Sequence, residues 1–379
     1  MPPPPPLHDW ALDPDVLHLN HGSYGGCPRA VLEASAAIRA RLEASPMRFF
    51  VIEWQAELDR ARSALAELLH APDDRLAFLA SATAGVQLAL DSTPIAAGDE
   101  LLVLEDGYRA CRNQLARIAA ERGAHVVVVP MPRPHDPDQL VEAIARARTP
   151  RTKLALLDHV TSPTAIVVPL ERILPRLAGV TVIVDGAHAP GQLALDVGAL
   201  LELGVAWYAG NNHKWLCAPK ASGFVVAAAP AVARPLVASH GASPEYGPAN
   251  RFHAQLDWQG THDPTAHLSV PAAIATVALL GDGWPRTIAR NHALALELCA
   301  RLGGTPLAPP SAIGTMAAMP VELTGDADAL QLALLRDGFE VPIIETPRGP
   351  LLRVSAHLYN RAEDADRLAS ALHGRVRFV

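Results

Sequence analysis

The chain has 379 residues, of which 50% are hydrophobic and 19% are charged, and its formal net charge is −7. This apolar content excludes a mostly disordered chain, and a negative balance without basic blocks excludes nucleic acid as the main partner. At roughly 150 residues per domain, the length corresponds to two or three domains. Only three basic residues are lysines (Lys153, Lys214 and Lys220), so each lysine stands out against a background of arginines.

The N-terminus, the apolar runs and the cysteines indicate where the protein resides. Met1 is followed by five prolines, which is typical of an extended lead-in and not of a signal peptide. No apolar run approaches the ~20 residues that cross a membrane. The four cysteines are widely spaced and fit neither a disulfide framework nor a zinc site. We therefore expect a cytoplasmic protein with no membrane partner.

In chain order, short β-rich runs alternate with longer helical runs from about residue 75 to residue 227. The predicted strands are Leu76–Leu79, Leu101–Glu105, His125–Pro130, Lys153–Asp158, Thr181–Asp185, Ala206–Ala209 and Gly223–Ala227. The predicted helices between them are Ala84–Asp91, Arg109–Glu121, Pro137–Arg148 and Leu170–Leu177. This alternation predicts an α/β domain on a mainly parallel seven-stranded sheet that is covered on both faces.

The pattern changes after about residue 270. Two long helices precede a mixture of strands and helices, which is typical of a smaller α+β domain. The expected elements are Val270–Leu280, Pro285–Leu302, Met316–Leu323, Asp326–Asp337, strands near Glu340–Ile344 and Leu351–Ser355, and Arg361–Leu372. We expect an N-terminal arm over residues 1–20, a large domain over 21–265 and a small C-terminal domain over 266–379.

Ligands of open α/β sheets bind at the carboxyl ends of the strands. Asp185 ends one predicted strand; it either caps a turn or holds a cationic ring nitrogen. Lys214 follows another strand among amides, an imidazole and an aromatic ring, and so does not lie on an amphipathic face. Lysine can lose its proton and act as a nucleophilic amine, whereas arginine cannot.

A third strand end leads into Ala80-Ser81-Ala82-Thr83-Ala84-Gly85. Free N–H groups at such a helix start favour an anion, although a plain N-cap has the same composition. The segment lacks the glycine fingerprints of nucleotide folds, which disfavours an NAD-linked enzyme. An acid, an amine and a phosphate cradle together predict pyridoxal 5′-phosphate (PLP), because PLP needs all three.

Six stretches resemble the class V aminotransferases of fold type I, and within them the isopenicillin N epimerase-like branch. They are Leu19–Gly25, Asp158–Pro163, Asp185–Gly191, Gly210–Leu216, Gly260–Thr261 and Arg353–Asn360. The resemblance therefore covers almost the whole chain. It implies PLP-dependent chemistry at the α-carbon of an amino-acid substrate, in a homodimer with shared active sites.

The resemblance also implies roles around the ring of the cofactor. Lys214 would form the Schiff base with PLP and then move the proton at Cα. Asp185 would pair with the pyridinium nitrogen, His188 and Ser162 would lie near the ring 3-oxygen, and Tyr108 would stack on the ring face.

Further residues are assigned by the same resemblance to the phosphate and to the substrate. Phosphate binding is implied for Ala82, Thr83, Asn211 and His213, and for Gly260 and Thr261 toward the neighbouring subunit. Arg353 would bind the substrate α-carboxylate bidentately, and Asn20 and Gly22 are further expected substrate contacts.

The reaction outcome stays open at this point. Epimerisation and transamination are the first expectation, and β-elimination from a sulfur-containing amino acid is the alternative. A cysteine desulfurase is not expected, because residues 341–352 contain no cysteine before Arg353. A non-catalytic binding module of the same fold would be expected to lose Lys214, Asp185 or Arg353. No metal is expected, since His18, His21 and His159 lack carboxylate or cysteine partners at ligand spacing.

Overall fold

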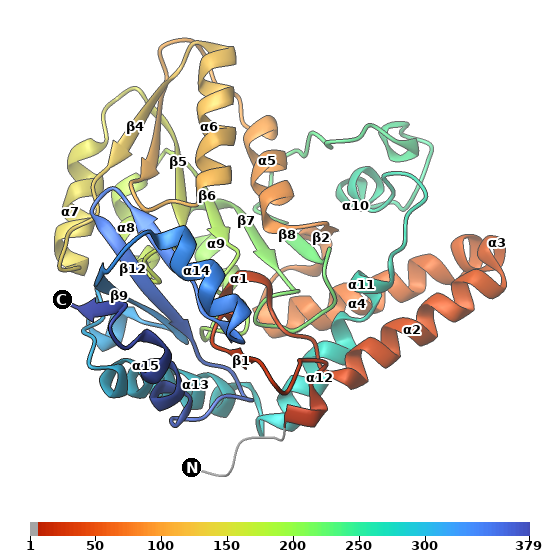
Figure 1. The fold of residues 1–379 in the computed structure, drawn as a ribbon. Helices are drawn as coiled ribbons and strands as arrows, with labels where there is room; N and C mark the ends of the chain where they lie inside the picture. Colours follow the sequence, from red (N-terminus) through yellow and green to blue (C-terminus); the bar gives the residue numbers. More distant parts are fainter. Residues whose placement is uncertain (1–6) are drawn as a thin grey trace.

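A computed structural model describes residues 7–379, and the proline-rich lead-in lies outside them. Its centre is a seven-stranded sheet of order β2-β8-β7-β6-β5-β3-β4 (Figure 1). The strands are β2 (Leu76–Leu79), β3 (Glu100–Leu104), β4 (His125–Val129), β5 (Thr152–Asp158), β6 (Thr181–Gly186), β7 (Val205–Asn211) and β8 (Gly223–Ala227). Only β8 runs antiparallel to its neighbours. The predicted α/β class and mainly parallel sheet are confirmed.

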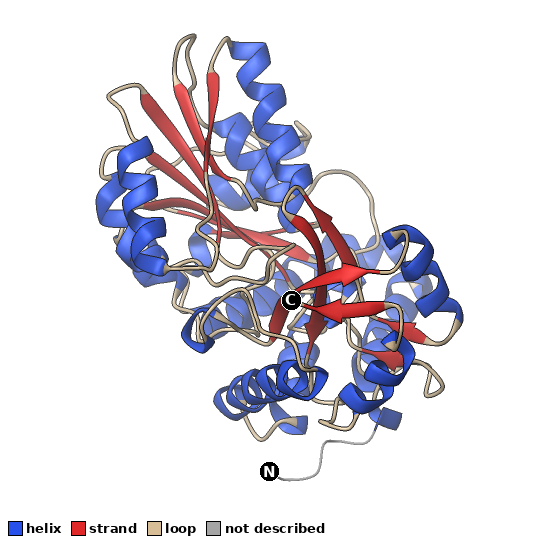
Figure 2. Ribbon diagram, turned by 60° about the vertical axis from the view of Figure 1, so that its left-hand side comes forward, coloured by secondary structure: helices blue, strands red, loops and turns tan. Residues whose placement is uncertain are grey.

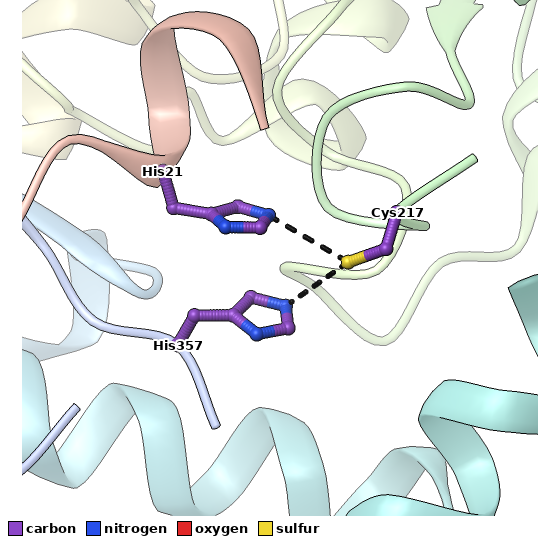
Figure 3. Close-up of side chains that lie close together, drawn as sticks. All are labelled: His21, Cys217 and His357. Carbon is purple, nitrogen blue, oxygen red and sulfur yellow. Dashed lines mark hydrogen bonds between the residues drawn. The ribbon is translucent and has the colours of Figure 1, made fainter. Parts of the chain in front are cut away.

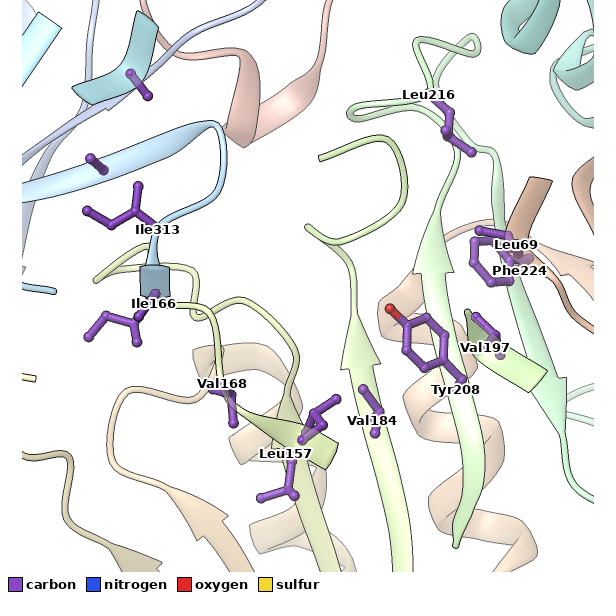
Figure 4. Close-up of a cluster of buried hydrophobic side chains, with 14 of the residues drawn as sticks. Leu69, Leu157, Ile166, Val168, Val184, Val197, Tyr208, Leu216, Phe224 and Ile313 are labelled. Atoms are coloured by element: carbon purple, nitrogen blue, oxygen red, sulfur yellow. The ribbon is translucent and has the colours of Figure 1, made fainter. Parts of the chain in front are cut away.

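Helices cover both faces of this sheet (Figure 2). One face carries α5 (Ala82–Ser92) and α6 (Arg109–Arg122); the other carries α7 (Pro137–Ala147), α8 (Leu170–Ile173) with the 3-10 turn Leu174–Leu177, and α9 (Val197–Glu202). Strand residues alternate between the two hydrophobic clusters, because successive side chains point to opposite faces. Thus Leu157, Val184 and Tyr208, from three adjacent strands, lie in one cluster (Figure 4).

The start of α5 lies close to the sheet because of one glycine. A Cβ built on Gly85 would lie 2.8 Å from the Cβ of Ala209 on β7. Any larger residue would push the helix away from the strand. Gly85 therefore sets the distance between the start of α5 and the end of β7.

The chain before β2 is mostly helical, which the sequence analysis did not assign. It forms β1 (Leu17–His18), α1 (His21–Tyr24), α2 (Arg29–Ala44), α3 (Pro46–Arg48), a π turn (Phe49–Glu53) and α4 (Trp54–Leu69). The buried residues Leu58, Ala61, Leu65 and Leu69 of α4 recur at helical spacing. After β8 come α10 (Arg251–Leu256), α11 (Thr265–Leu268) and α12 (Val270–Leu280), and α12 packs on α2 and α4.

The C-terminal part holds a second, antiparallel sheet of order β11-β12-β9-β13. Its elements are α13 (Trp284–Leu302), β9 (Met316–Leu323), α14 (Ala327–Arg336), β10 (Phe339–Glu340), β11 (Ile343–Thr346), β12 (Gly349–Ser355), α15 (Asp364–Leu372) and β13 (Val376–Phe378). The strand expected near 340–344 is in fact two strands. Pro342 lies between them and has no N–H to donate to a sheet.

A segment near the N-terminus and a segment of the C-terminal part form a short pair of parallel strands. Leu17 of β1 lies opposite Phe339 of β10, and His18 lies opposite Glu340. Leu19 and Ser355 extend the contact, since the Ser355 N–H donates to the Leu19 carbonyl over 2.8 Å. The N-terminal segment is therefore attached to the C-terminal part.

Across residues 7–379, no single helix is long and apolar enough to cross a membrane. One pair of helices, Thr265–Leu280 and Trp284–Leu302, reaches that length and composition jointly but is bent by 66°.

Candidate active site

The ends of several neighbouring strands surround a cavity of about 200 Å³. The turn from β2 into α5 contributes Ser81 and Thr83, β5 ends at Asp158, and β6 ends near Asp185. The full lining is Ser23, Tyr24, Ser81, Thr83, Tyr108, Asp158, Val160, Ser162, Asp185, Ala187, His188, Asn211, His213 and Lys214. The structure thus brings together eight of the residues that the sequence analysis predicted for the site.

Lys214 lies in the loop after β7, and its Nζ is 3.1 Å from Nε2 of His188. Burial lowers the pKa of Lys214 to about 8, although the negative charge of Asp185 opposes the shift. Burial also holds the pKa of His188 well below its usual value, and the charges of Lys214 and Arg353 act in the same direction. His188 is therefore neutral and accepts a hydrogen bond from the amine.

Asp185 is 4% exposed and needs a positive partner if it is ionised. One carboxylate oxygen accepts from the Ala187 N–H over 3.0 Å, and the other accepts from the Cys111 thiol over 3.1 Å. Among residues 7–379, no basic side chain forms an ion pair with it. This arrangement fits an acid that faces a cationic nitrogen of a bound group.

The start of α5 is fixed from the neighbouring strand. Ser81 caps the helix by accepting from the Ala84 N–H, and Asn211 accepts from the Ala82 N–H over 2.8 Å. The Ala82 N–H therefore already has a partner, and Asn211 orders the helix start. Thr83 and His213 line the cavity here. The Nδ1–H of His213 donates to the Ser222 carbonyl over 2.8 Å, which leaves Nε2 as its acceptor nitrogen.

Tyr108 lies at the mouth of the cavity, where its side chain is partly exposed. Its N–H donates to Asp158 over 3.1 Å, and partial burial raises the pKa of its phenol. Asp158 lies directly opposite Asp185 in the register of β5 and β6. Burial and the charge of Asp185 raise the pKa of Asp158 well above its usual value.

Arg353 on β12 is 3% exposed and has no acidic partner among the described residues. It donates to the Ser162 carbonyl, to the Ser23 hydroxyl over 2.8 Å and to the Asn20 amide oxygen over 3.4 Å. Burial lowers its pKa to about 10. A buried guanidinium held only by neutral groups is suited to bind a carboxylate.

Two predicted substrate contacts, Asn20 and Gly22, do not line the cavity. Asn20 contacts Arg353 and accepts from the Ser23 hydroxyl over 2.6 Å, so it orients the guanidinium. The Gly22 N–H donates to Ser355 over 3.2 Å, and a Cβ on Gly22 would lie 2.8 Å from the sulfur of Met316. Gly22 therefore serves the close packing of the segment that carries Ser23.

Gly260 and Thr261 do not line this cavity. They lie in a loop beside Trp54 and Phe78, where they line a separate cavity of about 350 Å³. The predicted role of these two residues concerns a partner subunit, so it stays a prediction.

Sequence reasoning missed several groups at the site. Asp158, Ser23 and Tyr24 were within stretches that carried the family resemblance, and Ser81 was within the predicted helix start. Cys111 gave no signal, because its contact with Asp185 depends on how α6 packs across β6.

Comparison with known proteins gives the family. The model for class-V aminotransferases matches residues 27–239. An isopenicillin N epimerase from Amycolatopsis lactamdurans is 38% identical and covers 96% of each chain. A probable chloroplastic L-cysteine desulfhydrase from Arabidopsis thaliana is 30% identical, over 96% of this chain and 84% of that protein. The solved cystine C–S lyase C-DES, in complex with cysteine persulfide, has a TM-score of 0.84 at 21% identity, over 96% and 98% of the two chains.

The chain belongs to the class V aminotransferase family. It is a PLP-dependent enzyme that acts at the α-carbon of an amino-acid substrate. The cavity fits PLP: Asp185 lacks a cation, Lys214 has an amine with a lowered pKa, and Thr83 lies at a helix start that favours phosphate.

Proposed function

We propose that the enzyme inverts the α-carbon of an amino acid, as an epimerase or racemase. The observation that carries this proposal is the Lys214–His188 pair, an amine that can give and take a proton beside a neutral imidazole. The similarity to isopenicillin N epimerases over almost the full length supports it. PLP, when bound, supplies the electron sink that stabilises negative charge at Cα.

The side chains of the site would divide the work. Arg353 would bind the substrate carboxylate, because it is buried and held only by neutral acceptors. Asp185 would hold the ring nitrogen. Thr83 would bind the phosphate, together with His213 in its protonated form, in which Nε2 also donates. Lys214 would take the α-proton, and a base positioned in this way contributes roughly 10²–10⁴-fold to a rate.

Epimerisation also requires a proton to return on the other face of the α-carbon. Tyr108 and Tyr24 are the two phenols that line the cavity. We assign this second proton transfer to Tyr108, which requires its phenol to face the α-carbon in place of the stacking role that the resemblance implies. Tyr108 also lines the adjoining cavity of about 610 Å³ and so lies where the two cavities meet. That second cavity offers room for a side chain much larger than that of cysteine.

A β-lyase acting on a sulfur-containing amino acid is the second candidate. Relatives described as L-cysteine desulfhydrases, at 30% identity, favour it. Incubation with L- and D-amino acids separates the two functions: an epimerase changes the chirality of recovered substrate, whereas a lyase releases pyruvate and sulfide. Release of pyruvate without any change of chirality would overturn the epimerase proposal.

Persulfide chemistry of the cysteine desulfurase kind is not part of the proposal. All four cysteines are buried, and none lies in residues 341–352 before Arg353. Burial raises the pKa of Cys111 and Cys217 above its usual range, which disfavours the reactive thiolate.

The cofactor itself is tested by the visible spectrum of the purified protein, with and without borohydride. The wild type is expected to absorb visible light after loading with PLP and to keep the cofactor on the protein after reduction. Lys214→Ala is expected to bind PLP without covalent fixation. A wild type that takes up no PLP would overturn the assignment.

We also propose the larger organisation that the resemblance implies. The enzyme would be a cytoplasmic homodimer in which Gly260 and Thr261 of one protomer reach the site of its partner. The chain would divide into an arm, a large domain over residues 21–265 and a small domain over 266–379. The exposed apolar tip between α2 and α4 supports the dimer, and the unpaired buried cysteines fit a reducing compartment.

A further inference from the structure

Three buried polar side chains that do not line the cavity lie close together in one cluster (Figure 3). It consists of His21 from α1, Cys217 from the loop after Lys214, and His357 from the segment after β12, none more than 2% exposed. The Cys217 sulfur is 3.7 Å from Nε2 of His21 and 3.5 Å from Nε2 of His357. The two imidazole rings stack with centroids 4.0 Å apart.

The partners of His21 fix its protonation. Nε2 is 3.1 Å from the Lys214 carbonyl oxygen, which can only accept, so this nitrogen carries the proton. Nδ1 accepts from the Gly26 N–H over 3.3 Å and from the Tyr359 hydroxyl over 3.0 Å. Burial lowers the pKa of His21 to about 3, which agrees with a neutral ring. The sequence analysis gave His21 no cysteine partner, but the fold places Cys217 beside it, and the cluster has the composition of a candidate metal site. The hydrogen bonds above use both nitrogens of His21.

His21 and Cys217 both contact the main chain of Lys214. The Lys214 carbonyl accepts from the Cys217 N–H over 2.9 Å as well as from His21, so both of its lone pairs are used. Cys217 closes this turn with a φ of +60°, an uncommon conformation for a residue other than glycine. The turn therefore depends on contacts from outside to hold its shape.

The segment that carries His21 is held against this turn. A Cβ on Gly25, where φ is +71°, would lie 2.1 Å from the His213 carbonyl oxygen and 3.0 Å from the Lys214 Cα. Lys220 donates to the Gly25 carbonyl over 2.8 Å. The approach is so close that a shift of His21 would move the main chain of Lys214 as well.

We propose that His21, oriented by the Tyr359 hydroxyl, is a positioning residue that holds the main chain of Lys214 so that its amine meets His188 inside the cavity. The link connects the C-terminal segment that follows Arg353 to the lysine. It rests on the proposed function only in taking Lys214 as the residue that carries PLP.

Two variants separate the two nitrogens of His21. In His21→Gln the amide nitrogen reaches the position of Nε2 and still donates to the Lys214 carbonyl. In His21→Asn the shorter side chain reaches only the position of Nδ1. The readout is the pH titration of the visible absorbance in the PLP-loaded protein, together with PLP affinity.

His21→Gln is expected to stay much nearer the wild type than His21→Asn, with a shift no larger than that of Tyr359→Phe, because it keeps the donor to the Lys214 carbonyl and loses only the Nδ1 acceptor. His21→Asn is expected to bind PLP roughly tenfold more weakly, the equivalent of one lost buried hydrogen bond, and to shift the titration midpoint by about one pH unit. The groups from other packed elements that face the Lys214 amine are Asp185, His188, Cys111 and Arg353, and they are unchanged in both variants.

His253→Asn is the matched control. His253 is also buried, and its Nε2 likewise contacts a main-chain carbonyl, that of Asp73, over 3.1 Å. It lies outside the cavity, so its variant should leave the titration unchanged. Tyr359→Phe should cause part of the His21→Asn shift, because it removes the hydroxyl that orients the ring.

Three results would overturn the proposal. One is a folded His21→Asn protein, with an unchanged melting temperature, that titrates like the wild type. A second is a His21→Gln protein as impaired as His21→Asn. The third is a stoichiometric transition metal in the purified wild type that is lost in His21→Gln.

A cofactor-free measurement separates this inference from the proposed function. The rate at which acetic anhydride acylates Lys214, followed by mass spectrometry against pH, reports the exposure and pKa of the amine without PLP. If the wild type takes up no PLP, the assigned function fails, yet a difference between His21→Asn and His21→Gln in this assay still supports the positioning role.

Discussion

Among the three lysines, only Lys214 has an environment that changes its chemistry. Lys153 is exposed on β5, and Lys220 reaches outward to hold the Gly25 carbonyl. Burial lowers the pKa of Lys214 to about 8, which favours the neutral amine far more than the usual value does. Arginine at this position would stay charged and could not act as a nucleophile.

The first prediction concerns pH. The rate at which the PLP-free protein captures added PLP, trapped by borohydride, should rise as pH increases through about 8, because only the neutral amine attacks the aldehyde. Asp185→Asn should move the midpoint to lower pH, since it removes the negative charge that opposes the effect of burial. A wild-type midpoint near the usual 10.5 would contradict the burial argument.

The second prediction concerns Arg353. Arg353→Ala should lower kcat/KM by roughly 10–100-fold, the range of one charge-assisted hydrogen bond of about 1.5–3 kcal/mol. PLP affinity should change much less than kcat/KM, because Arg353 contacts Ser162, Ser23 and Asn20 and none of the residues expected to hold the phosphate. Steady-state kinetics with a separate PLP titration check both parts, and unchanged kinetics would remove Arg353 from the substrate site.

At the residue scale, the sequence predicted those groups that directly follow strands. Asp185 and Lys214 were found this way because parallel strands bring their carboxyl ends to one edge. The contact of Arg353 with Asn20 and Ser23 joins residues more than 300 positions apart. No local pattern encodes such a contact, so only the family resemblance indicated these residues.

At the element scale, one buried ion pair joins α4 to the end of α10. Arg62 donates to Asp257 over 2.7 Å, and both side chains are almost fully buried. Breaking such a pair leaves a buried charge without a partner. This ion pair connects α4 to the segment that carries Gly260.

The third prediction follows from that pair. Arg62→Ala should lower the free energy of unfolding by roughly 3–5 kcal/mol, measured by denaturant titration. Arg60→Ala is the matched control, because Arg60 is exposed on the same helix and pairs with Glu57; its cost should stay within about 0.5 kcal/mol. Equal effects of the two variants would show that the buried pair contributes no more than a surface one.

Element by element, the sheet was predicted to within a few residues, because continuous Val, Ile and Leu runs bounded by turns are a strong signal. The helices before β2 were not assigned. In α2 only Val31, Ser35 and Leu42 are buried, so its apolar stripe is weak. Much of the surface that orders α2 and α4 comes from α12, about 200 residues later in the chain.

At the scale of the whole molecule, the apolar tip between α2 and α4 extends away from the sheet (Figure 1). Met47, Val51 and Ile52 there are 80%, 72% and 65% exposed. Such a group of large exposed side chains is typical of a protein–protein contact. The proposed homodimer would cover it.

The fourth prediction tests whether a dimer interface buries this apolar tip. Ile52→Asp should shift the protein from dimer toward monomer in analytical ultracentrifugation, because burying an unpaired charge is costly. Leu279→Asp is the control, since Leu279 is 83% exposed but lies on α12, outside this tip. A wild type that sediments as a monomer at all concentrations would contradict the proposed dimer.

The pairing of β1 with β10 determines when during synthesis the site can form. Leu17 and His18 leave the ribosome early, but their partners Phe339 and Glu340 are made more than 300 residues later. The sheet that carries Asp185 and Lys214 is complete by residue 227 and can fold before the partners of the arm exist. Asn20, His21 and Ser23 therefore take their places last, so in a nascent chain the strand-end residues Asp185 and Lys214 are in position before the arm completes the cavity and orients Arg353.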